Sequence, residues 1–329
     1  MLRLAHVAPD LGDLDFCYRA TSSDPYIGPV LGGAGSPKEA GAPQDASSPK
    51  DAGAEAPTDA ATDADAPDAT DASDAAAVSD AALDATIADA GADANQALDA
   101  AAGDAGKQVF LPYLSMTGYV ALQGSGTFEI AIVDASSQGC STPRLVGQVT
   151  LDAGRRSTLA LMGREDVDAS TGGAGGGTEL ALIAFTDDPT PDPTKTRVRL
   201  LHAAIGSPKR APESTLSASF VVGAATSDIP IARKIEPRHV AAASTIEPSV
   251  DPLGYHADMP LSTPARMRIS RSLDAGGTTW TSAAAPLGLR AGSIHTGIIV
   301  NDDASDLVIL WCTDENTPST ETSCTLLRP

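Results

Sequence analysis

Two histidines hold matching places in this sequence and are the first candidates for chemistry. His6 ends the run Leu2–His6 (LRLAH), and His202 ends the similar run Val198–His202 (VRLLH). An imidazole titrates near neutral pH, so each could act as a pH-sensitive switch. Both runs alternate as a β-strand does, and this puts each histidine on the apolar, core-facing side. We therefore favour a structural role, in which each ring is hydrogen-bonded inside the fold.

Four cysteines are the second set of reactive side chains. They allow three pairings, and we predict one bridge in each half of the chain, Cys17–Cys140 and Cys312–Cys324. The alternative is four unpaired buried thiols in a cytosolic protein. Bridges indicate an oxidising compartment. We expect no zinc site, because the chain has no Cys-x₂₋₄-Cys pair and its histidines, His256 and His295 among them, are scattered.

The remaining motifs favour no catalytic site and no cofactor. The glycine run 172–177 lacks the Gly-Lys-Ser/Thr ending of a phosphate loop, so we expect a hairpin tip. The pairs Asp187–Asp188 and Asp302–Asp303 could bind calcium weakly, but neither has the spacing of a calcium loop, so we favour solvated turns at strand ends. The chain has no Gly-x-Ser-x-Gly elbow for a nucleophilic serine. We therefore expect a protein that is not an enzyme.

The two histidine runs belong to a longer internal repeat. Gly118–Tyr119 corresponds to Gly254–Tyr255, and the residues from Glu179 onward correspond to those from Asp306 onward. From Arg3 to Glu179 is 176 positions, which becomes 105 without a 71-residue insert, against 107 from Arg199 to Asp306. Two copies of one domain, the first of them interrupted, explain this spacing.

Several runs of the first copy resemble the bacterial domain-of-unknown-function family 4397. They follow the same order as in that family: Arg3–Asp10, Leu14–Tyr18, Gly126–Ile130, Leu151–Gly154 and Leu182–Asp188. The second copy departs from the pattern after His202, where Pro208–Pro212 replaces the usual Pro-Asp turn. The resemblance implies tandem domains on secreted or envelope-attached proteins and no established activity.

Short alternating segments separated by turn residues predict an all-β fold with two tandem antiparallel β-sandwiches, immunoglobulin-like or transthyretin-like. The first sandwich takes residues 1–35 and 107–188, a Pro-rich linker takes 189–194, and the second sandwich takes 195–329. The insert, 36–106, has 27 alanines and no aromatic residue. Because it has so little to bury, we expect it to be disordered.

The charge of the chain bounds its partners and its compartment. The net charge is −21, of which the insert, with 16 acidic residues and two lysines, carries −14. This balance argues against nucleic acid and against anionic membrane surfaces. No apolar run reaches the ~20 residues of a membrane-spanning helix. Met1 directly precedes the first strand, with no basic and apolar segment before it. A chain that starts at a core strand resembles a precursor whose leader is missing. We therefore expect an extracytoplasmic protein (periplasm, cell surface or secreted) whose signal peptide is absent from this chain.

These observations favour a non-catalytic secreted or cell-envelope protein, a binding or adhesion module for an unknown protein or glycan. One alternative is a purely structural spacer with an acidic arm that collects calcium weakly. A hydrolase with an unrecognised site is a third alternative, and it would need a concave pocket with convergent polar groups.

The cysteine pairing gives a direct prediction. Titration of protein from its native source, unfolded without reductant, should find no reactive thiol among the four cysteines. Each bridge should contribute roughly 2–4 kcal/mol by restricting the unfolded chain. Four reactive thiols would contradict both the bridges and the oxidising compartment.

Overall fold

The structure is a computed structural model, and all its regular elements in the described residues are β-strands. It describes residues 1–32, 110–122, 126–137, 139–165, 179–188, 190–206, 213–222, 228–242, 250–259, 265–271, 279–285, 287–303, 306–314 and 323–329. The insert 36–106 and the glycine run 172–177 lie outside these residues. Met1–Lys38 and Lys107–Pro329 form one compact unit, which holds both sandwiches.

The first sandwich consists of two sheets. One sheet has the strand order β3-β1-β6-β7, and the other has the order β2-β4-β5. Leu2 and Leu4 of the first strand pack with Phe16, Ile130 and other apolar residues between the two sheets. The strands are β1 (Leu2–His6), β2 (Leu14–Arg19), β3 (Ser115–Met116), β4 (Gly126–Asp134), β5 (Leu145–Leu151), β6 (Arg156–Met162) and β7 (Ala181–Asp187).

The second sandwich repeats this plan with more strands. Its sheets have the orders β11-β8-β14-β15-β16 and β10-β9-β12-β13. Val198 and Leu200 take the places of Leu2 and Leu4, and they pack in a larger core with Phe220 and Trp311. The strands are β8 (Thr196–Ala203), β9 (Leu216–Val222), β10 (Ile229–Ile235), β11 (Tyr255–Met259), β12 (Ala265–Ser270), β13 (Thr279–Thr281), β14 (Ile294–Asp302), β15 (Asp306–Thr313) and β16 (Cys324–Leu327).

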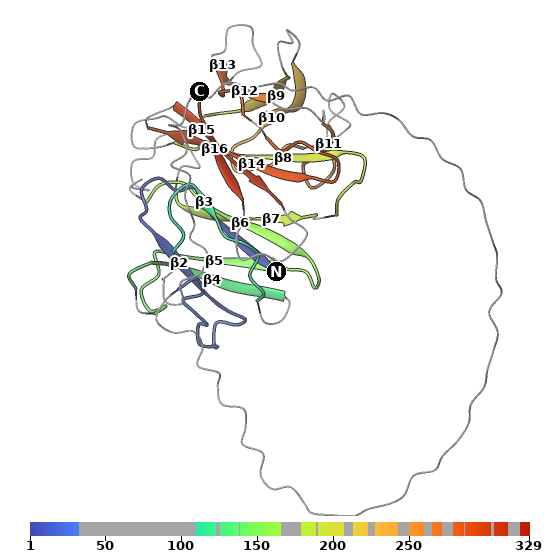
Figure 1. Ribbon diagram of the computed structural model, residues 1–329. Helices are drawn as coiled ribbons and strands as arrows, with labels where there is room; N and C mark the ends of the chain where they lie inside the picture. Colours follow the sequence, from blue (N-terminus) through green and yellow to red (C-terminus); the bar gives the residue numbers. More distant parts are fainter. Residues whose placement is uncertain are drawn as a thin grey trace, which may run out of the picture. The chain divides into compact units, whose positions relative to one another are not determined.

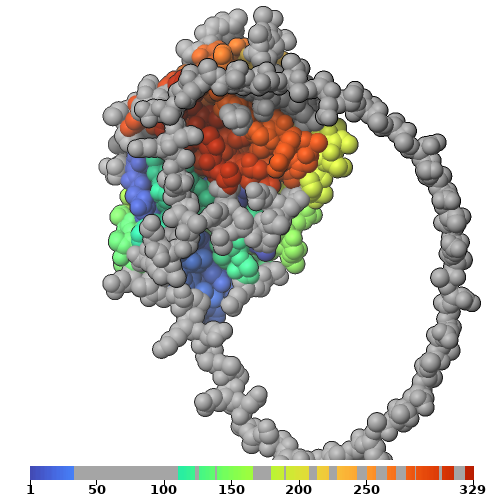
Figure 2. Space-filling view, viewed as in Figure 1, coloured from blue at the N-terminus to red at the C-terminus, as the bar shows by residue number. Residues whose placement is uncertain are grey.

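A third apolar cluster joins the two sandwiches. Ala5 and Val7 of the first copy share this cluster with Leu201 and Ala203 of the second. The β1 and β8 sheets therefore bury both faces, one in their own sandwich and one against each other, and the four sheets form four layers (Figure 1). On the face seen in Figure 2, the blue and green atoms of the first sandwich adjoin the red atoms of the second.

The expectation of antiparallel sheets needs one correction. Most neighbouring strands are antiparallel, but β1 pairs parallel with β6, and β8 pairs parallel with β14. The strands between β1 and β6 mostly form the other sheet of the sandwich, so the chain crosses over before it returns beside β1. A strand that returns to the sheet through such a crossover runs parallel to its neighbour. Parallel strands that are buried on both faces are typically apolar along their whole length.

Strand β10 lies within residues 224–252, a stretch whose prolines and serines favour a loop when the sequence is taken alone. Pro230 and the polar pair Arg233 and Lys234 conceal the strand in the sequence. Proline is tolerated here because β10 is an edge strand. The pairing of β10 with β9 shifts register between Ala232 and Ile235, which breaks the alternation that would reveal a strand.

Both disulfides join the pairs that the sequence predicts. Cys17 is bonded to Cys140 with Cα atoms 6.0 Å apart, and Cys312 is bonded to Cys324 with Cα atoms 4.0 Å apart. The second bridge joins directly opposed residues of β15 and β16. It therefore fixes the last strand to the sheet that packs against the first sandwich. Two bridges fit an oxidising compartment.

Candidate functional site

Four of the buried charged side chains in the described residues, Arg3, Asp187, Arg199 and Asp314, lie together between the two sandwiches. Arg3 on β1 and Arg199 on β8 point away from their own cores, on the side that carries the shared apolar cluster. Each is only 1% exposed. An isolated charge buried this deeply would cost many kcal/mol, so each guanidinium must have anionic partners.

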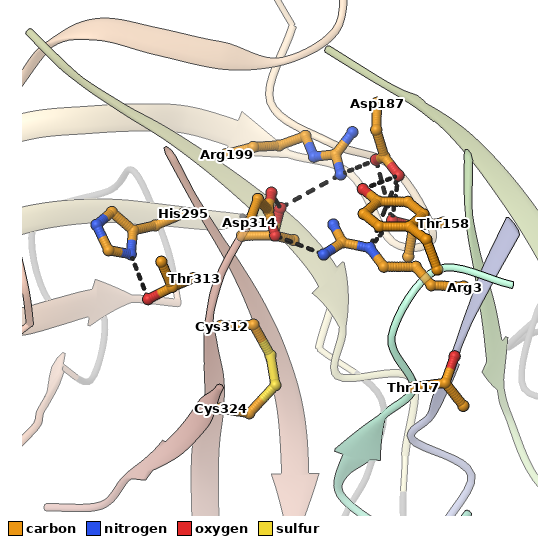
Figure 3. A network of polar contacts seen from close by, with 12 residues as sticks. Arg3, Thr117, Thr158, Asp187, Arg199, His295, Cys312, Thr313, Asp314 and Cys324 are labelled. Carbon is orange, nitrogen blue, oxygen red and sulfur yellow. Dashed lines mark hydrogen bonds and ion pairs between the residues drawn. A yellow bond between two sulfur atoms is a disulfide. The ribbon is translucent and has the colours of Figure 1, made fainter. Parts of the chain in front are cut away.

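Arg3 has partners in both sandwiches. Its Nε donates to Thr158 Oγ1 at 2.7 Å within the first sandwich, and its Nη1 donates to Asp314 Oδ1 at 2.6 Å in the second (Figure 3). Its Nε also lies 3.7 Å from Asp187 Oδ2. The ring of Tyr119 lies 4.8 Å from the guanidinium carbon, a cation–π contact.

Arg199 makes the reciprocal set of contacts. Its Nη2 donates to Asp187 Oδ1 of the first sandwich at 2.5 Å and to Thr296 Oγ1 of its own sandwich at 3.3 Å. Its Nη1 donates to the carbonyl oxygen of Thr186 at 3.0 Å. The ring of Tyr255 lies 4.7 Å from its guanidinium carbon.

These residues are related by the internal repeat. Thr158 lies beside Arg3 in the β1–β6 register, and Thr296 lies beside Arg199 in the β8–β14 register. Each threonine donates to the aspartate of its own copy, Thr158 to Asp187 at 2.8 Å and Thr296 to Asp314 at 2.6 Å. We call the whole set the arginine–aspartate seam: Arg3, Tyr119, Thr158, Asp187, Arg199, Tyr255, Thr296 and Asp314.

The seam has the geometry of a two-fold interface within one chain. Each copy gives its arginine to the aspartate of the other copy, Arg3 to Asp314 and Arg199 to Asp187. This exchange is the rule in symmetric dimers, where residue i contacts residue j and j contacts i. The duplicated chain therefore joins its halves as two identical subunits would join.

The symmetry fails at the tyrosine hydroxyls. Tyr119 donates to Asp187 Oδ2 at 2.9 Å, whereas the buried hydroxyl of Tyr255 has no hydrogen-bond partner among the residues that the structure describes. A nearby carboxylate holds the backbone of Tyr255, because the Tyr255 N–H donates to Asp251 Oδ1 at 2.9 Å. The preceding residue, Gly254, has a φ of 87°, and a side chain there would collide with Val240.

The electrostatics of the seam keep each charge in a fixed state. Burial alone would raise the pKa of Asp187, but Arg199 and Arg3 hold it below its usual range. Burial would lower the pKa of Arg3, but Asp314 and Asp187 raise it instead. Burial and the neighbouring Asp187 raise the pKa of Tyr119.

These directions determine what the seam can do chemically. General acid–base catalysis works best with a pKa near the working pH. In the seam the arginines and Asp187 stay charged at neutral pH, and Tyr119 keeps its proton. The two arginines and two aspartates balance in formal charge, so the arrangement suits a structural role in which it holds the two sandwiches together.

The histidines of the repeat lie inside the cores. His6 is fully buried, its Nε2 lies 3.0 Å from the carbonyl oxygen of Gly12, and its Nδ1 accepts from the N–H of Ala8 at 3.4 Å. His202 is also fully buried, and its Nδ1 accepts from the N–H of Ala204 at 3.2 Å. Both rings thus bond the backbone two residues ahead.

The aspartate pairs and the two remaining candidate histidines do not come together in one site. Asp187 belongs to the seam, while its neighbour Asp188 accepts from Arg197 Nη1 at 2.9 Å. Asp302 pairs with Arg328 at 2.7 Å. His256 and His295 lie on different strands, β11 and β14, of one sheet. Among the described residues, no group of three His, Cys, Asp or Glu side chains could hold a metal ion.

The described residues contain no helix with the length and apolar character needed to span a membrane. Comparison with known protein families finds no family that matches the chain, and comparison with curated proteins finds no matching relative. The resemblance to domain-of-unknown-function family 4397 therefore stays a prediction.

The unequal tyrosines give a matched pair of variants. Tyr119→Phe removes a hydrogen bond to a buried carboxylate and should lower the free energy of unfolding by about 1–2 kcal/mol. Tyr255→Phe removes a hydroxyl that has no partner, so it should be neutral or stabilising. Urea unfolding of both variants measures the difference, and equal losses would contradict the asymmetry of the seam.

Three buried histidines predict a dependence of stability on pH. Burial lowers the pKa of His6, His202 and His295 to about 4, from an ordinary 6.5. The unfolded chain thus binds protons more readily, so the stabilisation is complete above pH 6.5 and is lost as the pH falls toward 4. Each ring should contribute up to about 3 kcal/mol over this window.

Urea midpoints measured between these pH values test the histidine prediction. His6→Gln should reduce the slope of stability against pH, whatever its effect at neutral pH. His239→Gln is the matched control, because His239 is exposed, and its slope should equal that of the unchanged chain. An unaltered slope in His6→Gln would exclude His6 as a contributor.

Proposed function

We propose that this chain is a non-catalytic extracytoplasmic protein, whose two joined sandwiches bind a protein or glycan at the cell surface. The observation that carries the proposal is the arginine–aspartate seam. It uses the most concentrated set of buried charges to hold the sandwiches together, as the crossed pairs Arg3–Asp314 and Arg199–Asp187 show. A rigid body of this kind presents its outer sheets and loops in a fixed relation.

Two further features support the proposal. The bridges Cys17–Cys140 and Cys312–Cys324 are the kind of crosslink that persists outside the cytoplasm. The inner sheets are covered on both faces, so ligands are left with the outer sheets, the sheet edges and the loops. Sandwich domains commonly bind through such surfaces, and this support is an analogy at the level of the fold.

Binding to cells that make the protein tests the proposal. Labelled full-length chain should bind intact cells saturably, and excess unlabelled chain should compete with it. An unrelated secreted protein of similar size and negative charge is the control and should show only weak, unsaturable binding. If the chain behaves like this control, the proposal is wrong and a purely structural spacer is favoured.

A further inference from the structure

The outer face of the sheet β10-β9-β12-β13 differs in charge from the rest of the chain. The four strands contain three arginines and one lysine and neither aspartate nor glutamate, in a chain of net charge −21. Two of these cations, Arg266 and Arg268, alternate along β12 with the core residues Met267 and Ile269. Alternation places both arginines on the face away from the core.

The surroundings of Arg268 are hydroxylic, whereas Arg266 lies beside Val221 of β9. In the register of the sheet, Arg268 lies between Ser219 of β9 and Thr281 of β13. Two residues further along β12, Ser270 faces the same side and lies between Ser217 and Thr279. At the bulge of β10, Arg233 and Lys234 are exposed. We call this surface the outer basic face: Ser217, Ser219, Arg233, Lys234, Arg266, Arg268, Ser270, Thr279 and Thr281.

One carboxylate borders this face and fixes one of its cations. Both oxygens of Asp228 lie 2.6 Å from Arg268 Nη1, and Ser219 Oγ donates to Asp228 Oδ2 at 3.1 Å. Within the described part of the chain, Arg266 and Lys234 have no ion-pair partner. The face therefore combines one oriented arginine with two cations that are available to an external anion.

The chemistry of the face selects among polyanions. Exposed aromatic rings, on which single-stranded nucleic acids stack, are not offered here, because Trp280 of β13 points into the core and is 5% exposed. A membrane surface would call for apolar residues that insert, whereas the face is mostly cationic and hydroxylic. Arginine pairs well with carboxylates, and serine and threonine hydroxyls can donate to and accept from sugar hydroxyls.

We propose that the outer basic face binds a carboxylated polysaccharide, with Lys234 and Arg266 pairing with its carboxylates. These two cations lie on different strands of the sheet, β10 and β12, which suits a polymer with repeating charges. The inference rests on the proposed function, because it names the ligand class and the surface of that binding module.

Affinity measurement with polygalacturonate at about 0.15 M ionic strength, where the Debye length is about 8 Å, tests this inference on the full chain. The variant Lys234→Glu/Arg266→Glu should bind at least about tenfold more weakly, since two attractions become repulsions that solvent only partly screens. The control Arg155→Glu/Arg290→Glu changes the net charge equally at exposed sites on other elements. It should lose less than about twofold, because a charge beyond the Debye length is largely screened.

Thermal unfolding of both double variants should match that of the unchanged chain, since all four replaced side chains are exposed. The inference is overturned if polygalacturonate does not bind, if both double variants lose affinity equally, or if a single-stranded DNA homopolymer binds as tightly. Neutral dextran should not bind.

The cell-binding experiment separates this inference from the proposed function. If the chain binds cells saturably but ignores polygalacturonate, the ligand class is wrong and the binding module stands. If the basic face binds polygalacturonate but cells are not bound, the surface is correctly assigned and the proposed cellular role is wrong.

Discussion

Two buried arginines constrain the structure more than any other group. Arg3 and Arg199 each lie on a strand at the centre of the molecule, and neither could stay charged there without a carboxylate. Each takes a carboxylate from the opposite sandwich. The two halves must therefore dock in one register, because a shift would leave charges unpaired in an apolar interface.

The seam explains specificity better than it explains stability. Replacing a buried ion network with apolar residues is often neutral or stabilising, whereas removing one partner typically costs about 3–5 kcal/mol. The apolar cluster around the seam includes Val7, Leu201 and Ile298. Its burial stabilises the contact between the sandwiches but does not select one orientation of the two. The crossed ion pairs decide which arrangement of the two apolar faces is permitted.

The repeat and the disulfides fit this view. An interface that exchanges equivalent residues between halves arises naturally when a self-pairing domain is duplicated within one chain. Cys312 lies in the shared apolar cluster, and its bridge ties β16 to β15 two residues before Asp314. The covalent and ionic constraints thus meet at one end of β15, and the outer sheets remain for recognition.

The sequence alone determined the strand class and the duplication, and it predicted the cysteine pairs that the structure contains. Alternation along Leu2–His6 and Val198–His202 placed Leu2, Leu4 and Leu200 on the core side with the two histidines, because side-chain direction in a strand has a period of two. The repeat also matched Arg3 with Arg199, Tyr119 with Tyr255 and Asp187 with Asp314. It did not show that these residues meet.

Only the tertiary structure decided that meeting, because Arg3 and Asp314 are 311 residues apart and no local pattern encodes the docking of one sheet on another. The two parallel pairs and the irregular strand β10 were concealed for a related reason. Strand direction depends on where the chain crosses between sheets, and a bulge removes the alternation that would mark an edge strand.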